Sequence, residues 1–456
     1  MKRTLRDFAS ICGGRYAGAD LAYTGVATDT RTLARGELYF ALRGERFDGN
    51  QFVDAAAAAG AVAAVVDRSI ANAPLPLIEV QDGQVALTSA AGSWRARYAN
   101  PVIGVGGSNG KTTAKEMTAA IMARRGNGLS TRGNLNNHIG VPLTLLRLDA
   151  KHDSAVVEIG TNHPGEIAAL MNIAKPNVAL ITNAGAEHLE GFGDLDGVAR
   201  EEGEMVAGLW PAGVAVINAD DPYAAMWRGM TRARVCTFGI DRPADFHATQ
   251  IDETLADDGF RTTYTLNAPQ GRCTVRLNTG GRHNVRNSLA AAAAAVAAGA
   301  SLEDVATGLA MMQPVNGRLV PRHTKQGARL LDDSYNANPS SMTAGIDVLT
   351  RLSGEPWLVM GDMGELGDSA RASHEQIGAY ARARGVRRLF ATGKLSTLAV
   401  EAFGSGASWH ADTDALARAV EAALSPEVTL LVKGSRSARL ERVVAHLTGA
   451  VAKEMH

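Results

Sequence analysis

The sequence predicts an α/β protein of three domains. Short apolar runs with the length of buried strands alternate with helical segments along most of the 456 residues, which is typical of mainly parallel sheets. The chain is longer than one hydrophobic core usually supports. We therefore expect a small N-terminal α/β domain over residues 1–85, a central domain with a mainly parallel sheet over residues 86–314, and a Rossmann-like α/β domain over residues 315–456.

The composition is that of an ordinary globular protein, with 46% hydrophobic and 20% charged residues. The 46 basic and 47 acidic residues nearly cancel, so no global field recruits nucleic acid or an anionic membrane. The apolar runs are too short for a membrane helix, and the N-terminus lacks the apolar core of a signal peptide. The three cysteines show no paired spacing. We expect a cytoplasmic monomer with no nucleic-acid partner and no membrane insertion.

In the N-terminal segment, residues 36–42 and 61–66 have the pattern of strands, and residues 52–59 that of an alanine-rich helix. Two polar loops, at residues 28–31 and 43–49, are candidates for gripping a charged or sugar-like ligand. From the local sequence alone they are equally well explained as solvated turns.

A phosphate-binding loop is predicted at residues 102–113. An apolar run enters a glycine cluster, and Lys111 then opens a helical pattern. Backbone N–H groups in such a loop face phosphates, the lysine neutralises them, and Thr112 is placed to ligate Mg²⁺. Val105 stands where the usual pattern has glycine, and the alternative is a glycine-rich turn with a chance Lys-Thr. The candidate ATP-binding residues here are Gly107, Ser108, Asn109, Gly110, Lys111, Thr112 and Thr113.

Two further polar residues follow separate predicted strands of the central domain. Glu158 lies near the carboxyl end of the predicted strand at residues 154–159, and His188 closely follows the run at residues 177–183. Ligands of open α/β sheets bind at the carboxyl ends of strands, so both side chains are expected beside the phosphate loop, where they suit a Mg²⁺ environment. Taken singly, a surface glutamate and a capping or core histidine would be the simpler explanations.

Polar loops elsewhere carry further candidates. Asn134, Asn136 and Asn137 form one amide-rich loop, whose side chains can orient a carboxylate or peptide without adding charge. Asx turns and caps are the alternative explanation. In the third segment, residues 433–437 form a basic loop after a predicted strand, placed to receive an anion.

Short polar motifs recur along nearly the whole chain. They are Asp29-Thr-Arg31, Phe40-Ala-Leu-Arg-Gly44, Gly107-Ser-Asn-Gly-Lys-Thr-Thr113, Asn134-Leu-Asn-Asn-His-Ile-Gly-Val-Pro142, Glu158-Ile-Gly160, His188-Leu-Glu-Gly-Phe-Gly193, Gly281-Arg-His-Asn-Val-Arg-Asn287, Asp332-Asp-Ser-Tyr-Asn-Ala-Asn-Pro339, Gly361-Asp-Met-Gly-Glu-Leu-Gly367 and Lys433-Gly-Ser-Arg436.

With these motifs the chain resembles the Mur ligase family, and the motifs that begin at Asp332 and Gly361 resemble the branch that adds D-alanyl-D-alanine. The resemblance implies an ATP-dependent, ADP-forming amide ligase of peptidoglycan biosynthesis, with a central P-loop ATPase domain and Mg²⁺ as cofactor. Its substrates would be UDP-N-acetylmuramoyl-tripeptide and D-alanyl-D-alanine. The tripeptide carboxylate would attack the γ-phosphate to give an acyl phosphate, which the amine would then displace.

The resemblance also implies roles for single residues. Lys111 would stabilise the γ-phosphoryl group, Thr112 and Glu158 would hold one Mg²⁺, and His188 a second. Nucleotide contacts would come from Asn284, Asn287, Arg318 and Asp333, with Asp333 on the ribose. Asp29, Thr30 and Arg31 would lie at the UDP-sugar site, and Asn336 and Asn338 on the D-alanyl-D-alanine side.

One position departs from the family pattern. Many members carry a carbamylated lysine shortly after the motif that begins at His188, and an ungapped alignment places Glu202 there. A glutamate supplies a carboxylate without carbamylation, although its arm is shorter by roughly 3–4 Å. We therefore expect Glu202 to be catalytic and Glu202→Gln to reduce turnover strongly.

Two other functions remain open at this point. A sister Mur or folylpolyglutamate-type ligase would add a different amino acid, and a nucleotide-switch module would bind ATP without ligation. The amine that the protein accepts distinguishes the first. The second is excluded if ATP is turned over only when both co-substrates are present.

Overall fold

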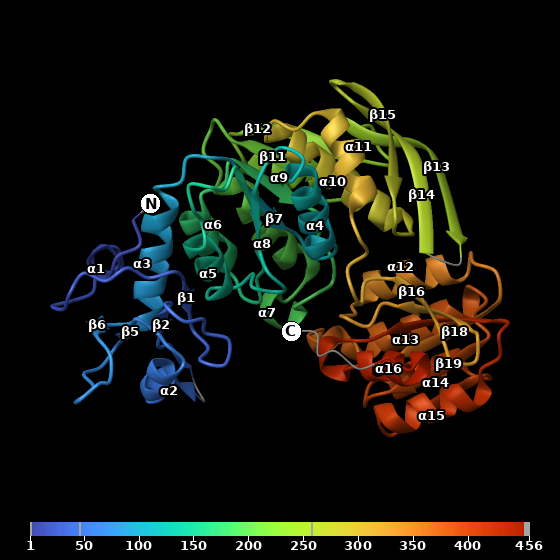
Figure 1. The fold of residues 1–456 in the computed structure, drawn as a ribbon. Helices are drawn as coiled ribbons and strands as arrows, with labels where there is room; N and C mark the ends of the chain where they lie inside the picture. Colours follow the sequence, from blue (N-terminus) through green and yellow to red (C-terminus); the bar gives the residue numbers. More distant parts are fainter. Residues whose placement is uncertain (1, 45–46, 257–258, 451–456) are drawn as a thin grey trace.

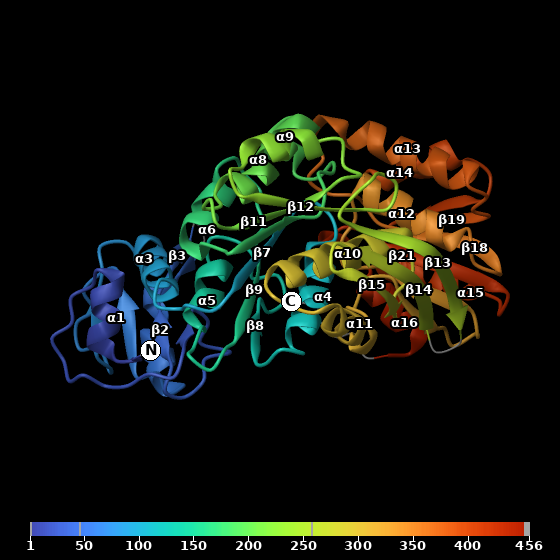
Figure 2. The ribbon, with the colours of Figure 1, turned by 90° about the horizontal axis from the view of Figure 1, so that it is seen from above.

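The computed structural model describes residues 2–44, 47–256 and 259–450. Three lobes follow one another along an arc, with the N-terminal lobe at one end, the central domain in the middle and the C-terminal lobe at the other end (Figures 1 and 2). Each lobe is built on its own main sheet, so the predicted three-domain α/β fold is confirmed.

The N-terminal lobe contains a parallel sheet in the order β1-β2-β5-β6. The predicted strands at 36–42 and 61–66 are present as β2 and β5. The elements are α1 (Leu5–Cys12), β1 (Val26–Ala27), β2 (Leu38–Phe40), β3 (Arg43–Gly44), β4 (Phe47–Asp48), η1 (Gly49–Phe52), α2 (Val53–Ala58), β5 (Ala63–Val66) and β6 (Leu77–Glu79).

The central sheet has the order β15-β14-β13-β12-β11-β10-β7-β9-β8. Its strands are β7 (Val102–Gly106), β8 (Gly128–Ser130), β9 (Ser154–Glu158), β10 (Val178–Ile181), β11 (Val214–Asn218), β12 (Arg234–Gly239), β13 (Phe246–Ala256), β14 (Gly259–Ala268) and β15 (Gly271–Leu277). The accompanying helices are α3 (Gly83–Arg95), α4 (Lys111–Met122), α5 (Gly140–Leu146), α6 (Glu166–Ala174), α7 (Leu189–Phe192), α8 (Leu195–Ala207), α9 (Ala224–Met230), α10 (Arg282–Ala297) and α11 (Leu302–Met311).

The parallel strands of this sheet are buried on both faces. Side chains alternate along a strand, so Leu180 packs in the cluster with α4, α10 and α11, whereas Ala179 and Ile181 pack in the cluster with α5, α6 and α8. This explains why the strands appear in the sequence as continuous apolar runs. The second cluster continues through α3 into the N-terminal lobe, and the predicted boundary at residue 85 falls inside α3.

The C-terminal lobe has a sheet in the order β16-β17-β21-β18-β19-β20, parallel except for the β16–β17 pair. Its elements are β16 (Val320–His323), β17 (Arg329–Asp332), α12 (Pro339–Leu349), β18 (Glu355–Met360), η2 (Gly367–Ser369), α13 (Ala370–Ala383), β19 (Arg388–Thr392), α14 (Ser396–Phe403), β20 (Ala407–His410), α15 (Thr413–Ala423), β21 (Val428–Lys433), η3 (Arg436–Ala438) and α16 (Glu441–Thr448).

One feature differs from the sequence-based description. Strands β13, β14 and β15 form an antiparallel meander that extends the central sheet, where the sequence predicted alternating strands and helices. Residues 282–288 form the first turns of α10. No helix in the described residues is long and apolar enough to cross a membrane.

The start of β14 joins the central sheet to the C-terminal lobe. Phe260 is completely buried in the same apolar cluster as Leu319, Ile346 and Leu349. The meander therefore places an aromatic ring of the central sheet in the core of the next domain.

Phe260→Ala should lower the free energy of unfolding by about 3–5 kcal/mol, because truncating a buried phenylalanine loses transfer free energy and leaves a cavity. Phe47→Ala is the control, since that ring is 50% exposed. Urea unfolding followed by tryptophan fluorescence measures both. Equal midpoints for the two variants would show that the ring is not part of the C-terminal core.

Candidate active site

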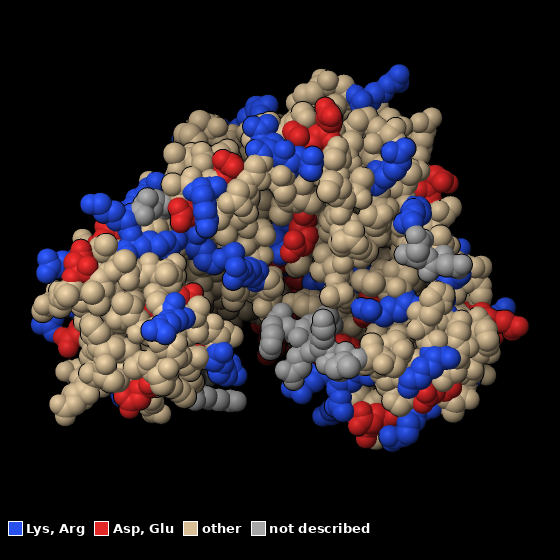
Figure 3. Space-filling model, in the orientation of Figure 1, with Lys and Arg blue, Asp and Glu red and all other residues tan. Residues whose placement is uncertain are grey.

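Two neighbouring cavities lie between the central and C-terminal domains, one of about 400 Å³ and the other of about 670 Å³. They share Asn109, Gly110, Arg318 and Ser341 as lining residues. In the space-filling view the molecule is hollowed between its N-terminal and C-terminal lobes, with Lys and Arg side chains on the walls (Figure 3). The phosphate loop, Glu158 and His188 lie at or just after the carboxyl ends of β7, β9 and β10, respectively.

The phosphate loop runs from the end of β7 to the start of α4, as predicted. Gly107 and Gly110 have φ angles of +110° and +84°, a region that side-chain-bearing residues rarely adopt. A Cβ at Gly107 would also collide with Thr182, and one at Gly110 with Asn287. The loop is fixed by Asn183, whose backbone carbonyl accepts from the Ser108 amide at 2.8 Å.

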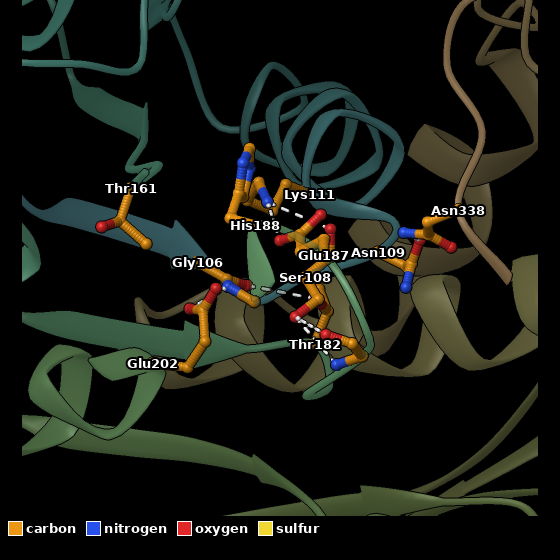
Figure 4. Close-up of polar contacts among 12 residues, drawn as sticks. Gly106, Ser108, Asn109, Lys111, Thr161, Thr182, Glu187, His188, Glu202 and Asn338 are labelled. Carbon is orange, nitrogen blue, oxygen red and sulfur yellow. Dashed lines mark hydrogen bonds and ion pairs between the residues drawn. The ribbon is translucent and has the colours of Figure 1, made fainter. Parts of the chain in front are cut away.

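The Lys111 side chain is 15% exposed and lies among carboxylates. Its Nζ lies 3.2 Å from Glu187 Oε1 and donates to the Ser108 carbonyl at 3.0 Å. Burial acts to lower the pKa of Lys111, but the charges of Glu187, Glu202 and Glu158 outweigh it and raise the pKa. The side chain is therefore a permanent cation at the loop. Figure 4 shows Lys111, Glu187 and His188 converging at the start of α4.

Glu158 and Thr112 lie together at the larger cavity. Glu158 Oε1 accepts from Thr112 Oγ1 at 3.3 Å and from Asn136 Nδ2 at 2.9 Å. Its other oxygen, Oε2, is buried without a hydrogen-bond partner in the described residues. A buried oxygen left unpaired is costly unless something binds it, and Mg²⁺ takes oxygen ligands.

The described residues contain no cluster of three or more His, Cys, Asp or Glu side chains of the kind that holds a metal unaided. Mg²⁺ usually takes one or two protein carboxylates and completes its shell with phosphates and water. The unpaired oxygen and the neighbouring hydroxyl therefore fit this ion.

His188 connects the two domains. Its Nδ1 lies 2.7 Å from Oε2 of Glu365, which belongs to the C-terminal lobe. Burial acts to lower the pKa of His188, but the Glu365 hydrogen bond and the charges of Glu187 and Glu365 raise it. The hydrogen bond from His188 in turn lowers the pKa of Glu365. His188 thus lies beside the loop as predicted, but one ring nitrogen faces a carboxylate.

The smaller cavity collects the predicted nucleotide residues Asn284, Asn287, Arg318 and Asp333. Arg318 stacks on the Tyr335 ring at 4.3 Å. Asp333 Oδ2 lies 2.6 Å from Lys433 Nζ. Burial lowers the pKa of Lys433, although Asp333 opposes it. The basic loop predicted from the sequence therefore contributes its first residue as the partner of Asp333.

The predicted substrate asparagines lie at the larger cavity, but several also have local partners. Asn134, Asn136, Asn137, Asn336 and Asn338 all line it. Asn137 Oδ1 accepts from the Ile139 amide at 3.2 Å and from the Gly140 amide at 2.9 Å, which is the Asx turn left open as the alternative. Asn338 is the N-cap of α12.

Asp29, Thr30 and Arg31 are not brought to these cavities. They lie in the N-terminal lobe, where Asp29 and Arg31 pair with each other at 2.6 Å, and neither cavity includes them. Their assignment to a UDP-sugar site stays a prediction.

Glu202 lies behind the phosphate loop. It is 1% exposed, and its Oε2 accepts from the Gly107 amide at 2.6 Å. Neither cavity includes it, and Figure 4 shows it on the far side of Gly106 from His188. Burial raises its pKa to about 8, despite the opposing charge of Lys111. The structure thus gives Glu202 a contact with the loop backbone, and its role at a metal stays a prediction.

Sequence reasoning did not identify Glu187, Glu365 or Asp220 as site residues. Glu187 adjoins His188, and Glu365 stands in the motif that begins at Gly361, so both lay within quoted or neighbouring segments. Asp220 follows β11, lines the smaller cavity and accepts from Arg286 Nε at 3.0 Å. Its position just after a buried strand could have marked Asp220 as a candidate site residue.

Comparison with known proteins agrees with this site. Three family profiles match the chain: the Mur ligase family catalytic domain over residues 22–95, the Mur ligase middle domain over residues 105–295, and the Mur ligase glutamate ligase domain over residues 317–436. A UDP-N-acetylmuramoyl-tripeptide–D-alanyl-D-alanine ligase of Escherichia coli is 44% identical over 448 residues, or 97% of this chain and 98% of the relative. The chain belongs to the Mur ligase family.

Other relatives and solved structures are also similar to this chain over nearly its whole length. A ligase of the same name from Bacillus subtilis is 35% identical, with 98% of both chains covered. The crystal structure of MurF from Acinetobacter baumannii superposes with a TM-score of 0.90 at 35% identity, covering 98% of this chain and 99% of that one. MurF of Thermotoga maritima, solved in complex with ADP, gives a TM-score of 0.80 at 25% identity, covering 93% and 97%.

Glu202→Gln should change how stability depends on pH. In the wild type the folded carboxyl, with its pKa of about 8 against an ordinary 4.5, keeps a proton that the unfolded chain releases. The contribution of this carboxyl group to the free energy of unfolding is therefore fully present below about pH 4.5 and is lost as the pH rises towards 8. Because one pKa unit corresponds to about 1.4 kcal/mol, the stability of the variant relative to wild type should rise by a few kcal/mol between pH 5 and pH 8.

Unfolding in urea at both pH values, without nucleotide, measures this difference. Glu401→Gln is the control, since that exposed side chain is hydrated in both the folded and the unfolded chain. A parallel pH dependence for Glu202→Gln and wild type would show that Glu202 is ionised in the folded protein.

Proposed function

We propose that this Mur ligase joins D-alanyl-D-alanine to UDP-N-acetylmuramoyl-tripeptide at the expense of ATP, releasing ADP and phosphate. The full-length similarity to ligases of that name supports the reaction. The structural observation that carries it is the larger cavity, in which the phosphate loop faces C-terminal residues such as Glu365 and Arg439. A nucleotide and an amine substrate held by different domains would meet there.

In the proposed reaction, an oxygen of the tripeptide carboxylate attacks the γ-phosphorus and ADP leaves. The dipeptide amine then attacks the carbonyl carbon of the acyl phosphate, and the tetrahedral intermediate expels phosphate as the nitrogen loses its proton. Two anions must approach in the first step, so catalysis depends on positioning and on fixed positive charge. Lys111 would supply that charge at the γ-phosphoryl group, because its surroundings keep it protonated.

Thr112 and Glu158 would hold Mg²⁺, which when bound screens the charge of the triphosphate. The phosphate-loop amides would receive the phosphate oxygens, as in other glycine-rich loops at helix starts. Asn284, Asn287, Arg318 and Asp333 would contact the rest of the nucleotide in the smaller cavity. Asn336 would lie with the amine substrate, and His188, beside the loop, is a candidate for a second Mg²⁺.

A phosphate-release assay tests the function, with ATP, UDP-N-acetylmuramoyl-tripeptide and D-alanyl-D-alanine each omitted in turn. Sustained release should require all three. Substituting D-alanine or another single amino acid for the dipeptide distinguishes a sister ligase, and release with ATP alone would contradict the proposal.

Glu158→Gln should raise the Mg²⁺ concentration for half-maximal turnover at least about tenfold, because an amide is a weaker ligand than a carboxylate, and even indirect contacts to a metal are worth about 10–100-fold in affinity. Titration of Mn²⁺ with ADP present, followed by electron paramagnetic resonance, measures the metal directly. Wild-type Mn²⁺ affinity in this variant would show that Glu158 is not a ligand.

A further inference from the structure

The phosphate loop is hydrogen-bonded directly to the C-terminal lobe through Asn109. Asn338 Nδ2 donates to Asn109 Oδ1 at 2.8 Å, and Asn109 Nδ2 donates to Ser340 Oγ at 3.0 Å. Figure 4 shows the side chains of Asn109 and Asn338 facing each other. We call Asn109, Asn338 and Ser340 the clasp.

Both ends of the clasp are fixed within their own domains. On the loop side, the Asn109 amide donates to Asn183 Oδ1 at 3.0 Å, and Asn183 Nδ2 donates to the Asn109 carbonyl at 2.9 Å. On the other side, Asn338 Oδ1 caps α12 by accepting from the Ser341 amide at 2.9 Å. This cap directs the oxygen of Asn338 towards the helix, so its NH₂ group is the part left to face Asn109.

The backbone beside the clasp leaves space for it. A Cβ at Gly185, in the segment after β10, would lie 2.7 Å from Asn109 Nδ2 and 3.2 Å from Ser340 Oγ. Gly185 is not among the residues with positive φ, so its backbone conformation does not itself require glycine. The missing side chain is explained by the room that Asn109 and Ser340 need.

The clasp lies where it can affect the nucleotide. Asn109 lines both cavities and precedes Gly110 and Lys111 in the loop. The bond from Asn109 to Ser340 joins residues 231 positions apart, so it exists only when the C-terminal lobe is docked. The interface also includes the pair of His188 and Glu365, on a different segment.

We propose that the clasp is a positioning device that sets the phosphate loop in its nucleotide-binding geometry when the C-terminal lobe docks. Asn109 is the positioning residue on the loop, and Asn338 and Ser340 hold it from the other domain. Docking of the lobe that supplies the amine substrate then also tightens the hold on the nucleotide. This inference rests on the proposed function for its kinetic test, but its binding test is independent of ligation.

A double-mutant cycle tests the clasp, using Asn109→Ala, Ser340→Ala and both together. Calorimetric titration with ADP is the first measurement. A net hydrogen bond of about 0.5–1.5 kcal/mol corresponds to about a two- to tenfold change, so Ser340→Ala should weaken ADP binding by that factor. Asn109→Ala loses both bonds of the clasp and should weaken ADP binding by at least as much. The double variant should bind ADP no more weakly than the single variant that has the lower ADP affinity. If the two factors multiply, the residues act separately and the proposal is wrong.

Thr343→Ala is the matched control, because the Thr343 hydroxyl bonds to the Pro339 carbonyl within α12 at 3.0 Å and does not cross between domains. Its ADP affinity should equal that of wild type. In the full reaction, the clasp variants should raise the KM for ATP while the KM for UDP-N-acetylmuramoyl-tripeptide stays unchanged. An equal rise in both KM values would indicate general damage and would overturn the assignment.

Gly185→Ala disturbs the same contact without removing a polar group. It should weaken ADP binding as Ser340→Ala does, and adding it to Ser340→Ala should cause no further loss. Gly229→Ala is the control, since a Cβ there meets no atom within 4 Å. Wild-type ADP affinity in Gly185→Ala would overturn the proposal. If the ADP affinities of wild type and variants follow the expected cycle but the wild type releases no phosphate with all substrates present, the proposed function is refuted and the clasp is still supported.

Discussion

A partly buried ammonium group that must stay charged constrains the whole site. Removing Lys111 from water costs several kcal/mol unless opposite charge surrounds it. Glu187 and Glu158 supply that charge, together with Glu202 when that carboxyl is ionised, and the three come from different segments. Glu158 ends β9, whereas Glu187 follows β10 and Glu202 lies on α8. The parallel sheet brings the first two to its carboxyl edge, and α8 packs its residues against the same strands. The fold therefore places three carboxyl groups around the Lys111 ammonium group.

This arrangement has a consequence for binding. A triphosphate approaching Lys111 meets carboxylates that already neutralise it, so some of that negative charge must be screened or carry a proton. Among the residues that the structure describes, Glu158 Oε2 has no hydrogen-bond partner and suits a divalent cation. The raised pKa of Glu202 favours its neutral form at neutral pH. The two buried glutamates thus differ in chemistry: Glu158 lines the cavity where an ion would lie, and Glu202 is turned towards a backbone amide.

The parts of this structure that the sequence predicted are local or follow from the geometry of parallel strands. The loop at 107–113, the strands that lead to it, and the convergence of Lys111, Thr112 and Glu158 required only that strand ends share one edge. The meander of β13, β14 and β15 was missed because its half-exposed strands do not form the continuous apolar runs that mark buried ones. The bonds from His188 to Glu365 and from Asn109 to Ser340 could not be predicted, since each joins separate domains.

Glu202 shows why a matching position does not by itself define a role. Alignment with the family places this residue where a carbamylated lysine would reach the metal, but its shorter side chain ends at the Gly107 amide. A hydrogen bond of 2.6 Å to a loop N–H, in a fully buried setting, orients the backbone that will face the phosphates. That contact needs an acceptor oxygen and no net charge. A carboxyl that is protonated on its other oxygen provides it, so support of the loop and a raised pKa are compatible, whereas ligation of a metal would require the proton to leave.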